Sequence, residues 1–237
     1  MAWTRFHPLT RITIVLALVL ALASLAGWER VGNALANFSP GGTFETRCAE
    51  LPSSEVEVEL KPLVVRENRN EPFEALARMT RDRSLQHRTI GVTQANFGHR
   101  STVDMKGVED RYNHRACVRP RVRVELFVQP LIVYVASEYA TDPCRARVIR
   151  EHEDRHVQVF ATFARESAGQ LATDLARVIG RGPHFGMTLE DAQHGVDRRI
   201  GDALATFMRE AERTLSERQA SVDTPDEYQR VGAACTG

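Results

Sequence analysis

The chain has 237 residues, and its 31 lysines and arginines are balanced by 31 aspartates and glutamates, so the formal net charge is zero. No net field therefore draws the chain toward nucleic acid or an anionic membrane surface, and we expect no nucleic-acid partner. A hydrophobic content of 43% is enough for one sizeable core, or for one domain with a helical extension.

The N-terminus has the pattern of an export signal. Arg5 and Arg11 precede an apolar run, 12–26, that no charge interrupts, and small residues at 24–26 offer a cleavage site. The run is short for a membrane span of about 20 residues, but an uncleaved anchor stays open as an alternative. Residues 1–27 are therefore predicted to be a signal peptide or a membrane anchor. We expect the remainder to be secreted or periplasmic, or anchored to the inner membrane and facing the periplasm.

Cysteines are few and even in number. In an exported chain they suggest two disulfides, and three pairings are possible. No C-x-x-C pair is present, which argues against a zinc site built from thiolates. The four residues are Cys48, Cys117, Cys144 and Cys235.

The first half of the chain after the signal has mainly β patterns. Residues 28–54 contain prolines and glycines and are predicted to be a linker, which leaves 55–237 as the folded domain. A short helix is expected over 71–80. Pro130 predicts either a bulge or a split in the strand that contains it. Alternating apolar residues predict strands at 55–60, 90–97, 102–105 and 118–135, the last being the strongest.

Two long helices are predicted after the strands. The first is expected over 145–179, where Gly180 ends it, and the second from the N-cap residue Thr188 to about Gln219. The short connection between them predicts an antiparallel hairpin. The expected fold class is α+β, with a small antiparallel sheet packed against this long helical hairpin.

The first long helix contains the segment His152-Glu153-Asp154-Arg155-His156, which has the pattern H-E-x-x-H. Residues four apart share one helix face, so both imidazoles can reach one metal ion, and Glu153 beside them can take a proton from a metal-bound water. The alternatives are a surface helix with paired polar residues and hydrogen-bonded core histidines. A zinc site is favoured because the other positions on the same stripe are apolar: Ile149, Phe160 and Phe163.

A catalytic zinc site needs one more ligand from the protein. Such sites have three protein ligands and keep one position for water. No further histidine follows the motif in the spacing of the metzincins. With the hairpin turn near Gly182, residue 154 is expected opposite residue 212. The carboxylates in range are Glu210, Glu212 and Glu217, with residues 223–228 just beyond, and His114 in the β region also stays open.

Several further motifs accompany H-E-x-x-H. They are the short helix after Pro72, the segment Gly91-Val92-Thr93, Cys117 before the strongest strand, and a Q-x-x-x-D segment from Gln219 to Asp223. In this order the motifs resemble those of the bacterial predicted secreted zinc-dependent proteases, a family of largely unknown function. The resemblance covers residues 55–230.

This resemblance implies a zincin-like metallopeptidase domain with His152 and His156 as zinc ligands and Glu153 as general base. The function expected from it is zinc-dependent hydrolysis of peptide bonds at the bacterial cell envelope, on a peptide or protein substrate. The alternative is a non-enzymatic or inactive envelope domain whose metal site is structural or absent.

The chain departs from the family near its C-terminus. Family members typically carry Tyr-Asp and then a histidine there, where a further ligand is suspected. This chain has Val222-Asp223 in place of Tyr-Asp, and Glu227-Tyr228 where the histidine would stand. Glu227 is therefore predicted as the third ligand, and Tyr228 as a group that polarises an oxyanion.

The departure also favours one disulfide pairing. For Glu227 to reach the metal, the segment after Pro225 must fold back onto the start of the first long helix. A bond between Cys144 and Cys235 would hold it there. This pairing leaves Cys48 to pair with Cys117.

Overall fold

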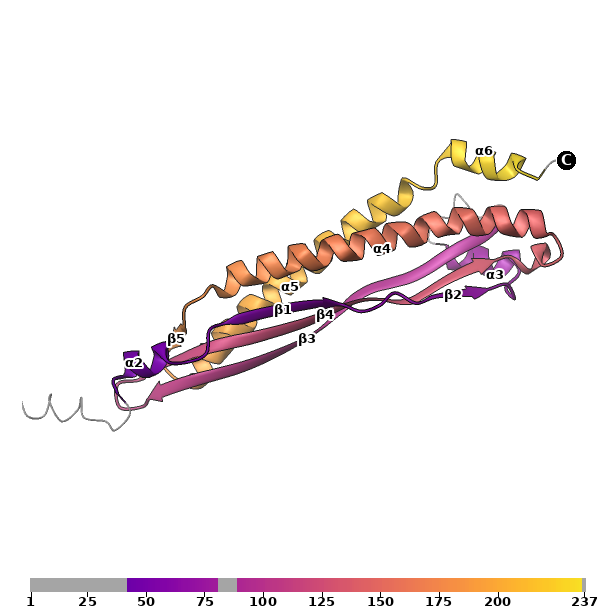
Figure 1. Ribbon diagram of the computed structural model, residues 1–237. Helices are drawn as coiled ribbons and strands as arrows, with labels where there is room; N and C mark the ends of the chain where they lie inside the picture. The colour runs from indigo at the N-terminus through magenta and orange to yellow at the C-terminus, as the bar shows by residue number, and fades with distance from the viewer. Residues whose placement is uncertain (1–41, 81–88, 236–237) are drawn as a thin grey trace, which may run out of the picture. The chain divides into compact units, whose positions relative to one another are not determined.

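A computed structural model describes residues 42–80 and 89–235 (Figure 1). The chain divides after Leu51 into two compact units. The described part of the first unit holds helix α2 (Phe44–Ala49), which begins at the N-cap Thr43, so part of the predicted linker is helical. The predicted signal or anchor, 1–27, lies outside the described residues. In the part of the chain that the structure describes, we find no helix long and apolar enough to cross a membrane.

The second unit is built around one long strand, β4 (Arg115–Val135). Strand β3 (Gly91–Asp110) runs antiparallel to β4 along one edge for almost its full length. Three short strands pair with β4 along the opposite edge. They are β5 (His184–Gly186), β1 (Glu55–Leu60) and β2 (Val65–Asn68).

The sheet differs from the predicted one in two respects. Strands β1 and β2 run parallel to β4, so the sheet is mixed rather than antiparallel. The segments predicted as separate strands at 90–97 and 102–105 are one continuous strand. Of the two alternatives at Pro130, the bulge is confirmed. The register shifts opposite Pro130, between Ala95 and Phe97, because a proline has no N–H to donate to the ladder.

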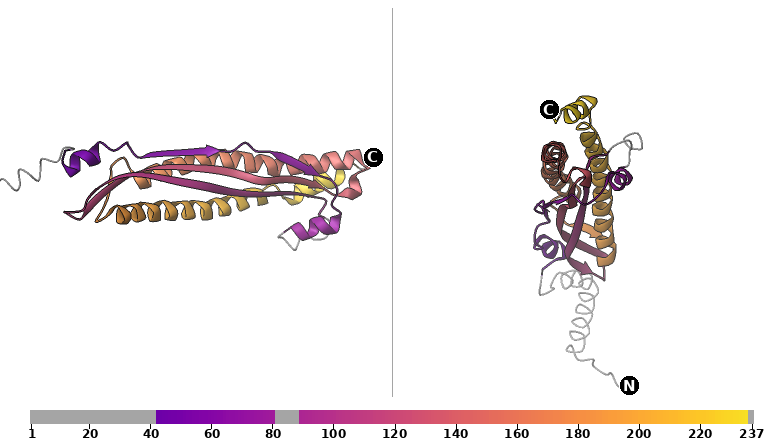
Figure 2. Two further views of the ribbon diagram at one scale, coloured as in Figure 1. Left: turned by 90° about the horizontal axis from the view of Figure 1, so that it is seen from below. Right: turned by 90° about the vertical axis from the view of Figure 1, so that its right-hand side faces the viewer.

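Two long helices cover one face of this sheet, as the hairpin prediction required (Figure 2). Helix α4 (Pro143–Ile179) begins at the N-cap Asp142, and Gly180 ends it with a positive φ of 58°. Helix α5 (Leu189–Ala220) begins at the predicted N-cap, Thr188, whose side chain accepts a hydrogen bond from Asp191 N.

The core between the layers is apolar. Alternate residues of β4 point to the helices, as the period of two in a strand requires. Each long helix contributes one apolar stripe. The buried residues are Val118, Val122, Val124 and Leu126 of β4, Leu171, Leu175 and Ile179 of α4, and Ala192, Val196, Ile200 and Leu204 of α5.

Two short helices lie near the end of the sheet where β3 begins and β4 ends (Figure 1). Helix α3 (Phe73–Met79) occupies the predicted place, and its buried Leu76 contacts Tyr134. Helix α6 (Pro225–Ala233) was not predicted. Thr224 accepts a hydrogen bond from the backbone N–H of the third residue of α6 and therefore acts as its N-cap, with Pro225 at the first helical position.

Candidate metal centre

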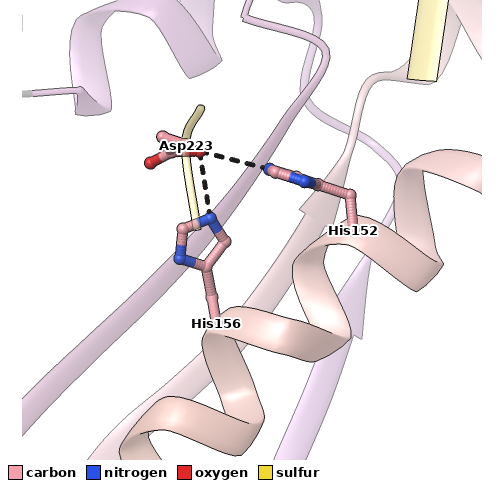
Figure 3. A group of neighbouring side chains, drawn as sticks. All are labelled: His152, His156 and Asp223. Atoms are coloured by element: carbon pink, nitrogen blue, oxygen red, sulfur yellow. Dashed lines mark hydrogen bonds and ion pairs between the residues drawn. The ribbon is translucent and has the colours of Figure 1, made fainter. Parts of the chain in front are cut away.

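His152 and His156 lie one turn apart on α4, and both side chains point toward Asp223, in the segment between α5 and α6 (Figure 3). The Nε2 atom of each histidine is 3.3 Å from the same atom, Oδ1 of Asp223. The histidines are 8% and 9% exposed. The three ligand atoms lie within 4.8 Å of one another, so this group could hold a metal ion.

The other ring nitrogens are also bound. Nδ1 of His152 is 3.1 Å from Oε1 of Glu227, and Nδ1 of His156 is 2.6 Å from Oε1 of Gln219. The amide of Gln219 also donates to the backbone oxygen of His156 at 3.2 Å. An acceptor at Nδ1 keeps the proton on that nitrogen, so the lone pair of Nε2 is directed at the shared position.

Glu227 has two further partners. Arg230 donates to it at 2.7 and 2.9 Å, and Arg155 forms an ion pair with it. The two guanidinium groups occupy lone pairs of the carboxylate that His152 does not use. Glu227 is 8% exposed, and this set of partners is what makes a buried carboxylate tolerable.

Glu153 points from α4 toward β3, and it is 4% exposed. The hydroxyl of Thr93 donates to its Oε2 at 2.8 Å. A Cβ on Gly91 would lie 2.5 Å from Oε1 of Glu153 and 2.7 Å from Cγ2 of Ile149, so only glycine allows α4 to approach β3 this closely. Gly91 therefore makes room for the Glu153 carboxylate, and Thr93 holds it by a hydrogen bond.

Burial and hydrogen bonds shift the pKa values of these groups. Burial lowers the pKa of His152, but the hydrogen bond to Asp223, the charge of Glu153 and the hydrogen bond to Glu227 outweigh it, so the pKa is raised. The pKa of His156 is raised in the same way: burial opposes the shift, and the hydrogen bonds to Asp223 and Gln219 outweigh it.

The pKa values of the three acidic groups shift in different directions. Burial raises the pKa of Glu153. The pKa of Asp223 is far below its usual range, because its hydrogen bonds to the two histidines outweigh the effect of burial. The hydrogen bond from Arg230 is the main reason that the pKa of Glu227 is also far below its usual range. Without a metal, the site is thus a network of carboxylates and readily protonated histidines.

The structure brings together all five residues predicted for the site, but it gives Glu227 another position. Glu227 binds the Nδ1 side of His152, whereas the Nε2 atoms of both histidines face Asp223, which was not singled out as a ligand. The hairpin register explains the difference. The predicted register set residue 212 opposite residue 154, and so residue 210 opposite His156, whereas Gln219 lies beside His156. Helix α5 therefore ends beside the histidines, and the segment that follows it reaches them at Asp223.

The other candidates lie away from the histidines. Glu210 and Glu217 pair with Arg213 on the exposed side of α5. Glu212 is also exposed. His114 lies in the turn between β3 and β4, at the opposite end of that hairpin from Gly91.

Tyr228 lies beside the site, as predicted. Its ring centroid is 6.2 Å from that of His152, it is 41% exposed, and it hydrogen-bonds to Asp223. The role of Gln219 was not predicted, although Gln219 and Asp223 are the two ends of the Q-x-x-x-D motif. The motif was therefore visible in the sequence, but the sequence did not show that both of its ends contact His156.

The predicted disulfide between Cys144 and Cys235 is confirmed, with the two Cα atoms 6.1 Å apart. Cys48 and Cys117 are each disulfide-bonded as well, and no cysteine of the described residues is free. Disulfides form and persist in oxidising, extracytoplasmic environments, which agrees with the expected export.

Comparison of the chain with protein-family models, with curated proteins and with solved structures finds no match. The resemblance to secreted zinc-dependent proteases therefore stays a hypothesis, carried by the motifs alone.

Proposed function

We propose that this chain is a zinc-dependent hydrolase that cleaves peptide bonds outside the cytoplasm. The observation that carries the proposal is the convergence of two Nε2 atoms on one carboxylate oxygen, each at 3.3 Å. With zinc–ligand distances near 2.0–2.1 Å, the corners of a tetrahedron are about 3.3–3.4 Å apart. The two histidine–carboxylate distances therefore fit a tetrahedral ion with little movement of the side chains.

The donor set also fits a catalytic site. Two imidazoles and one carboxylate are a common set of ligands for catalytic zinc, which keeps its fourth position open. His152, His156 and Asp223 supply that set. Glu227 and Gln219 would act as the outer partners that orient the two imidazoles. We further propose that the α4 helix packed on its sheet is a zincin-like arrangement.

Zinc bound by these residues would lower the pKa of a water molecule and polarise the carbonyl group of the substrate. Glu153 provides the proton acceptor. Thr93 donates to its Oε2, so the carboxylate would be held in place to take a proton from the attacking water and to return it to the leaving amine. Burial raises the pKa of Glu153, which brings it nearer to the range in which one group serves as both base and acid.

Tyr228 has a second role in this proposal. Tyr228 is 41% exposed and its hydroxyl hydrogen-bonds to Asp223, so it would lie where solvent reaches the site. A substrate carbonyl that enters from solvent would meet this hydroxyl, which can donate a hydrogen bond to the oxygen as negative charge develops on it.

A non-enzymatic envelope domain with a structural or absent metal is the second candidate. One observation favours it: each histidine is already hydrogen-bonded at both nitrogens, and their pKa values are raised. Two protonated histidines among carboxylates would satisfy the buried groups without a metal.

The first experiment is zinc content by elemental analysis of the purified protein and of three alanine variants. We expect one zinc per chain in the wild type and none in His156→Ala or Asp223→Ala. Glu227→Ala should retain zinc with weaker affinity, because Glu227 binds the ligand rather than the ion. Zinc lost only in Glu227→Ala, and kept in Asp223→Ala, would restore Glu227 as the third ligand.

The test of catalysis is hydrolysis of a denatured protein substrate by the zinc-loaded wild type and by Glu153→Gln. The variant should keep its zinc and lose activity by roughly 10²–10⁴-fold, the usual contribution of a general base. A wild type that binds zinc but has the same activity as Glu153→Gln would favour the structural site.

A further inference from the structure

Asp223 and Glu227 lie on a short segment with little packing of its own. We define the C-terminal strap as residues 221–235, which follow α5 and end at Cys235. Of the nine residues of α6 in this strap, only Glu227 and Val231 are buried. A helix of this length is shorter than the roughly 12–15 residues that an isolated helix needs in water. The position of the strap on α4 therefore depends on a few specific contacts.

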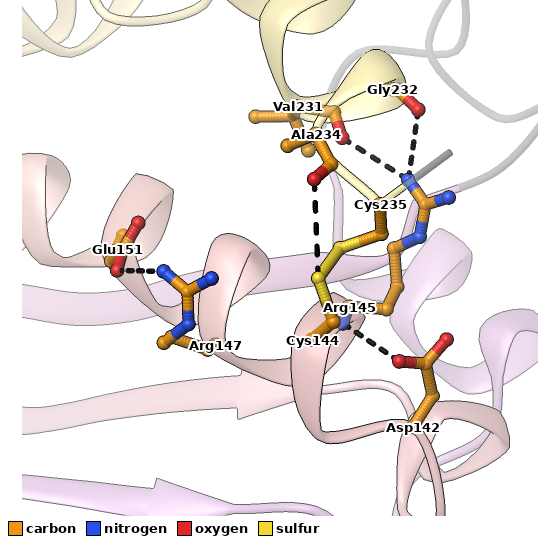
Figure 4. Close-up of a disulfide and its surroundings, with 9 residues drawn as sticks. All are labelled: Asp142, Cys144, Arg145, Arg147, Glu151, Val231, Gly232, Ala234 and Cys235. Carbon is orange, nitrogen blue, oxygen red and sulfur yellow. Dashed lines mark hydrogen bonds and ion pairs between the residues drawn. A yellow bond between two sulfur atoms is a disulfide. The ribbon is translucent and has the colours of Figure 1, made fainter. Parts of the chain in front are cut away.

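The strongest of these contacts are at its far end (Figure 4). The disulfide joins Cys235 to Cys144, in the first turn of α4. Beside it, Arg145 donates to the backbone oxygens of Val231 at 3.1 Å and Gly232 at 3.0 Å. The strap is thus fixed at both ends. Helix α5 holds it before Asp223, and the disulfide together with Arg145, which we call the clasp, holds it after Glu227.

The clasp is also close to the metal ligands. Cys144 precedes His152 by eight residues, which is about 12 Å along a helix. Glu227, which binds Nδ1 of His152, lies between the two fixed ends. Without the disulfide and the Arg145 contacts, α6 would be held on α4 chiefly by Val231 and by the contacts of Glu227 with His152 and Arg155. We expect Glu227 and Asp223 then to move more freely about the position that the two imidazoles share.

The disulfide is accessible to a reductant. Cys144 and Cys235 are both partly exposed, whereas Cys117 is 0% and Cys48 is 3% exposed. Thiol–disulfide exchange needs direct attack on a sulfur atom, so exposure decides which bond reacts first. A mild reductant should open Cys144–Cys235 and leave the buried half-cystines intact.

We propose that the Cys144–Cys235 disulfide is a redox latch on the metal centre, an inference that rests on the proposed zinc site. A dithiol reductant attacks one sulfur, forms a mixed disulfide and then closes on itself. Cys144 and Cys235 gain two electrons and two protons as thiols, and the dithiol is oxidised to its disulfide. The strap then leaves α4, and the affinity for zinc falls.

The experiment measures zinc affinity of the full chain against a chromophoric chelator, before and after treatment with a phosphine reductant, which has no thiol to bind zinc. Alkylation and mass spectrometry check that only Cys144 and Cys235 have been reduced. We expect affinity to fall by roughly 10–100-fold, the usual cost of losing an outer partner of a zinc ligand. The double variant Cys144→Ser/Cys235→Ser should start at the lower affinity and should not respond to the reductant.

A second measurement follows the strap itself. In the zinc-free protein, reduction should speed hydrogen exchange in residues 221–235 and leave residues 189–220 unchanged. Equal zinc affinity in the oxidised and reduced protein would overturn the latch and leave the metal site standing. A response of the double serine variant equal to that of the wild type would also overturn it. An oxidised protein that binds no zinc at all would overturn the proposed function, and the latch with it.

Discussion

The two halves of α4 bury the same helix face against different surroundings. In the second half, Leu171, Leu175 and Ile179 pack against apolar residues of the sheet and α5. In the first half, His152 and His156 are buried by polar groups of the strap and of the end of α5. Apolar burial has no direction, so many packings satisfy it. A buried polar group needs a partner at the right distance and angle, so the first half depends on single contacts.

The largest expected effect is on the apolar half. Leu175 is fully buried, so Leu175→Ala should lower the free energy of unfolding by about 2–5 kcal/mol, through lost transfer energy and a cavity. Urea unfolding measures this change. Zinc affinity of the folded variant should stay within twofold of the wild type, since Leu175 touches none of the ligands.

Val64→Ala is the matched control, because Val64 is an apolar residue that is 59% exposed. It should change the free energy of unfolding by less than about 0.5 kcal/mol. If Leu175→Ala weakened zinc binding tenfold, the two halves of α4 would be coupled, and the comparison between them would fail.

In the polar half of α4, the property expected to change is zinc affinity, and it should depend on pH. Zinc displaces a proton from each histidine, and both histidines have a pKa above the ordinary 6.5. Below those pKa values, apparent zinc affinity should therefore fall by up to about 100-fold per pH unit, equivalent to about 2.7 kcal/mol. Chelator competition between pH 5 and 8 measures it, and Leu175→Ala should give the same slope.

In the zinc-free protein, the raised histidine pKa values favour the fold at low pH, whereas they oppose zinc binding there. Raised histidine pKa values stabilise the fold below 6.5, and this contribution is lost as the pH rises through the raised values. The lowered pKa values of Asp223 and Glu227 stabilise the fold above the ordinary carboxyl range, and this contribution is lost as the pH falls. Zinc-free protein should thus be most stable at about pH 5–6.5, and a stability maximum above pH 7.5 would contradict the network.

A smaller effect is expected from the outer partner of His156. Gln219→Leu removes the acceptor at Nδ1 and leaves the ligand atoms in place, so zinc affinity should fall by roughly 10–100-fold. Gln170→Leu is the control, because Gln170 is an exposed glutamine that bonds to Asp174 on the same helix. Equal affinities in the two variants would show that Gln219 only fastens α5 to α4.

The same contrast explains what the sequence could predict. Helices α4 and α5, the end of α4 at Gly180, the N-cap Thr188 and the hairpin follow from local patterns, and so does the histidine pair at i and i+4. Asp223, the third member of the cluster, did not, because a hairpin register set by packing decides whether residue 210 or Gln219 lies beside His156. The parallel course of β1 and β2 was missed for a similar reason: alternation identifies a strand but not its partner or direction.

The smallest effects come from two equivalent helix caps, one in each region. Thr188 caps α5 and Thr224 caps α6, each by accepting a backbone N–H. Replacing either by alanine should cost about 1 kcal/mol of helix stability. Thr188→Ala should lower the free energy of global unfolding by this amount, because α5 is part of the core. It should leave zinc affinity unchanged.

Thr224→Ala should instead leave the urea midpoint of the zinc-free protein almost unchanged and weaken zinc binding by about fivefold, which is what 1 kcal/mol amounts to. The reason is that α6 contributes one buried valine to packing, Val231, but carries the partner of His152. A loss of global stability in Thr224→Ala equal to that in Thr188→Ala would mean that the strap unfolds together with the core. The latch could not then open independently of the fold.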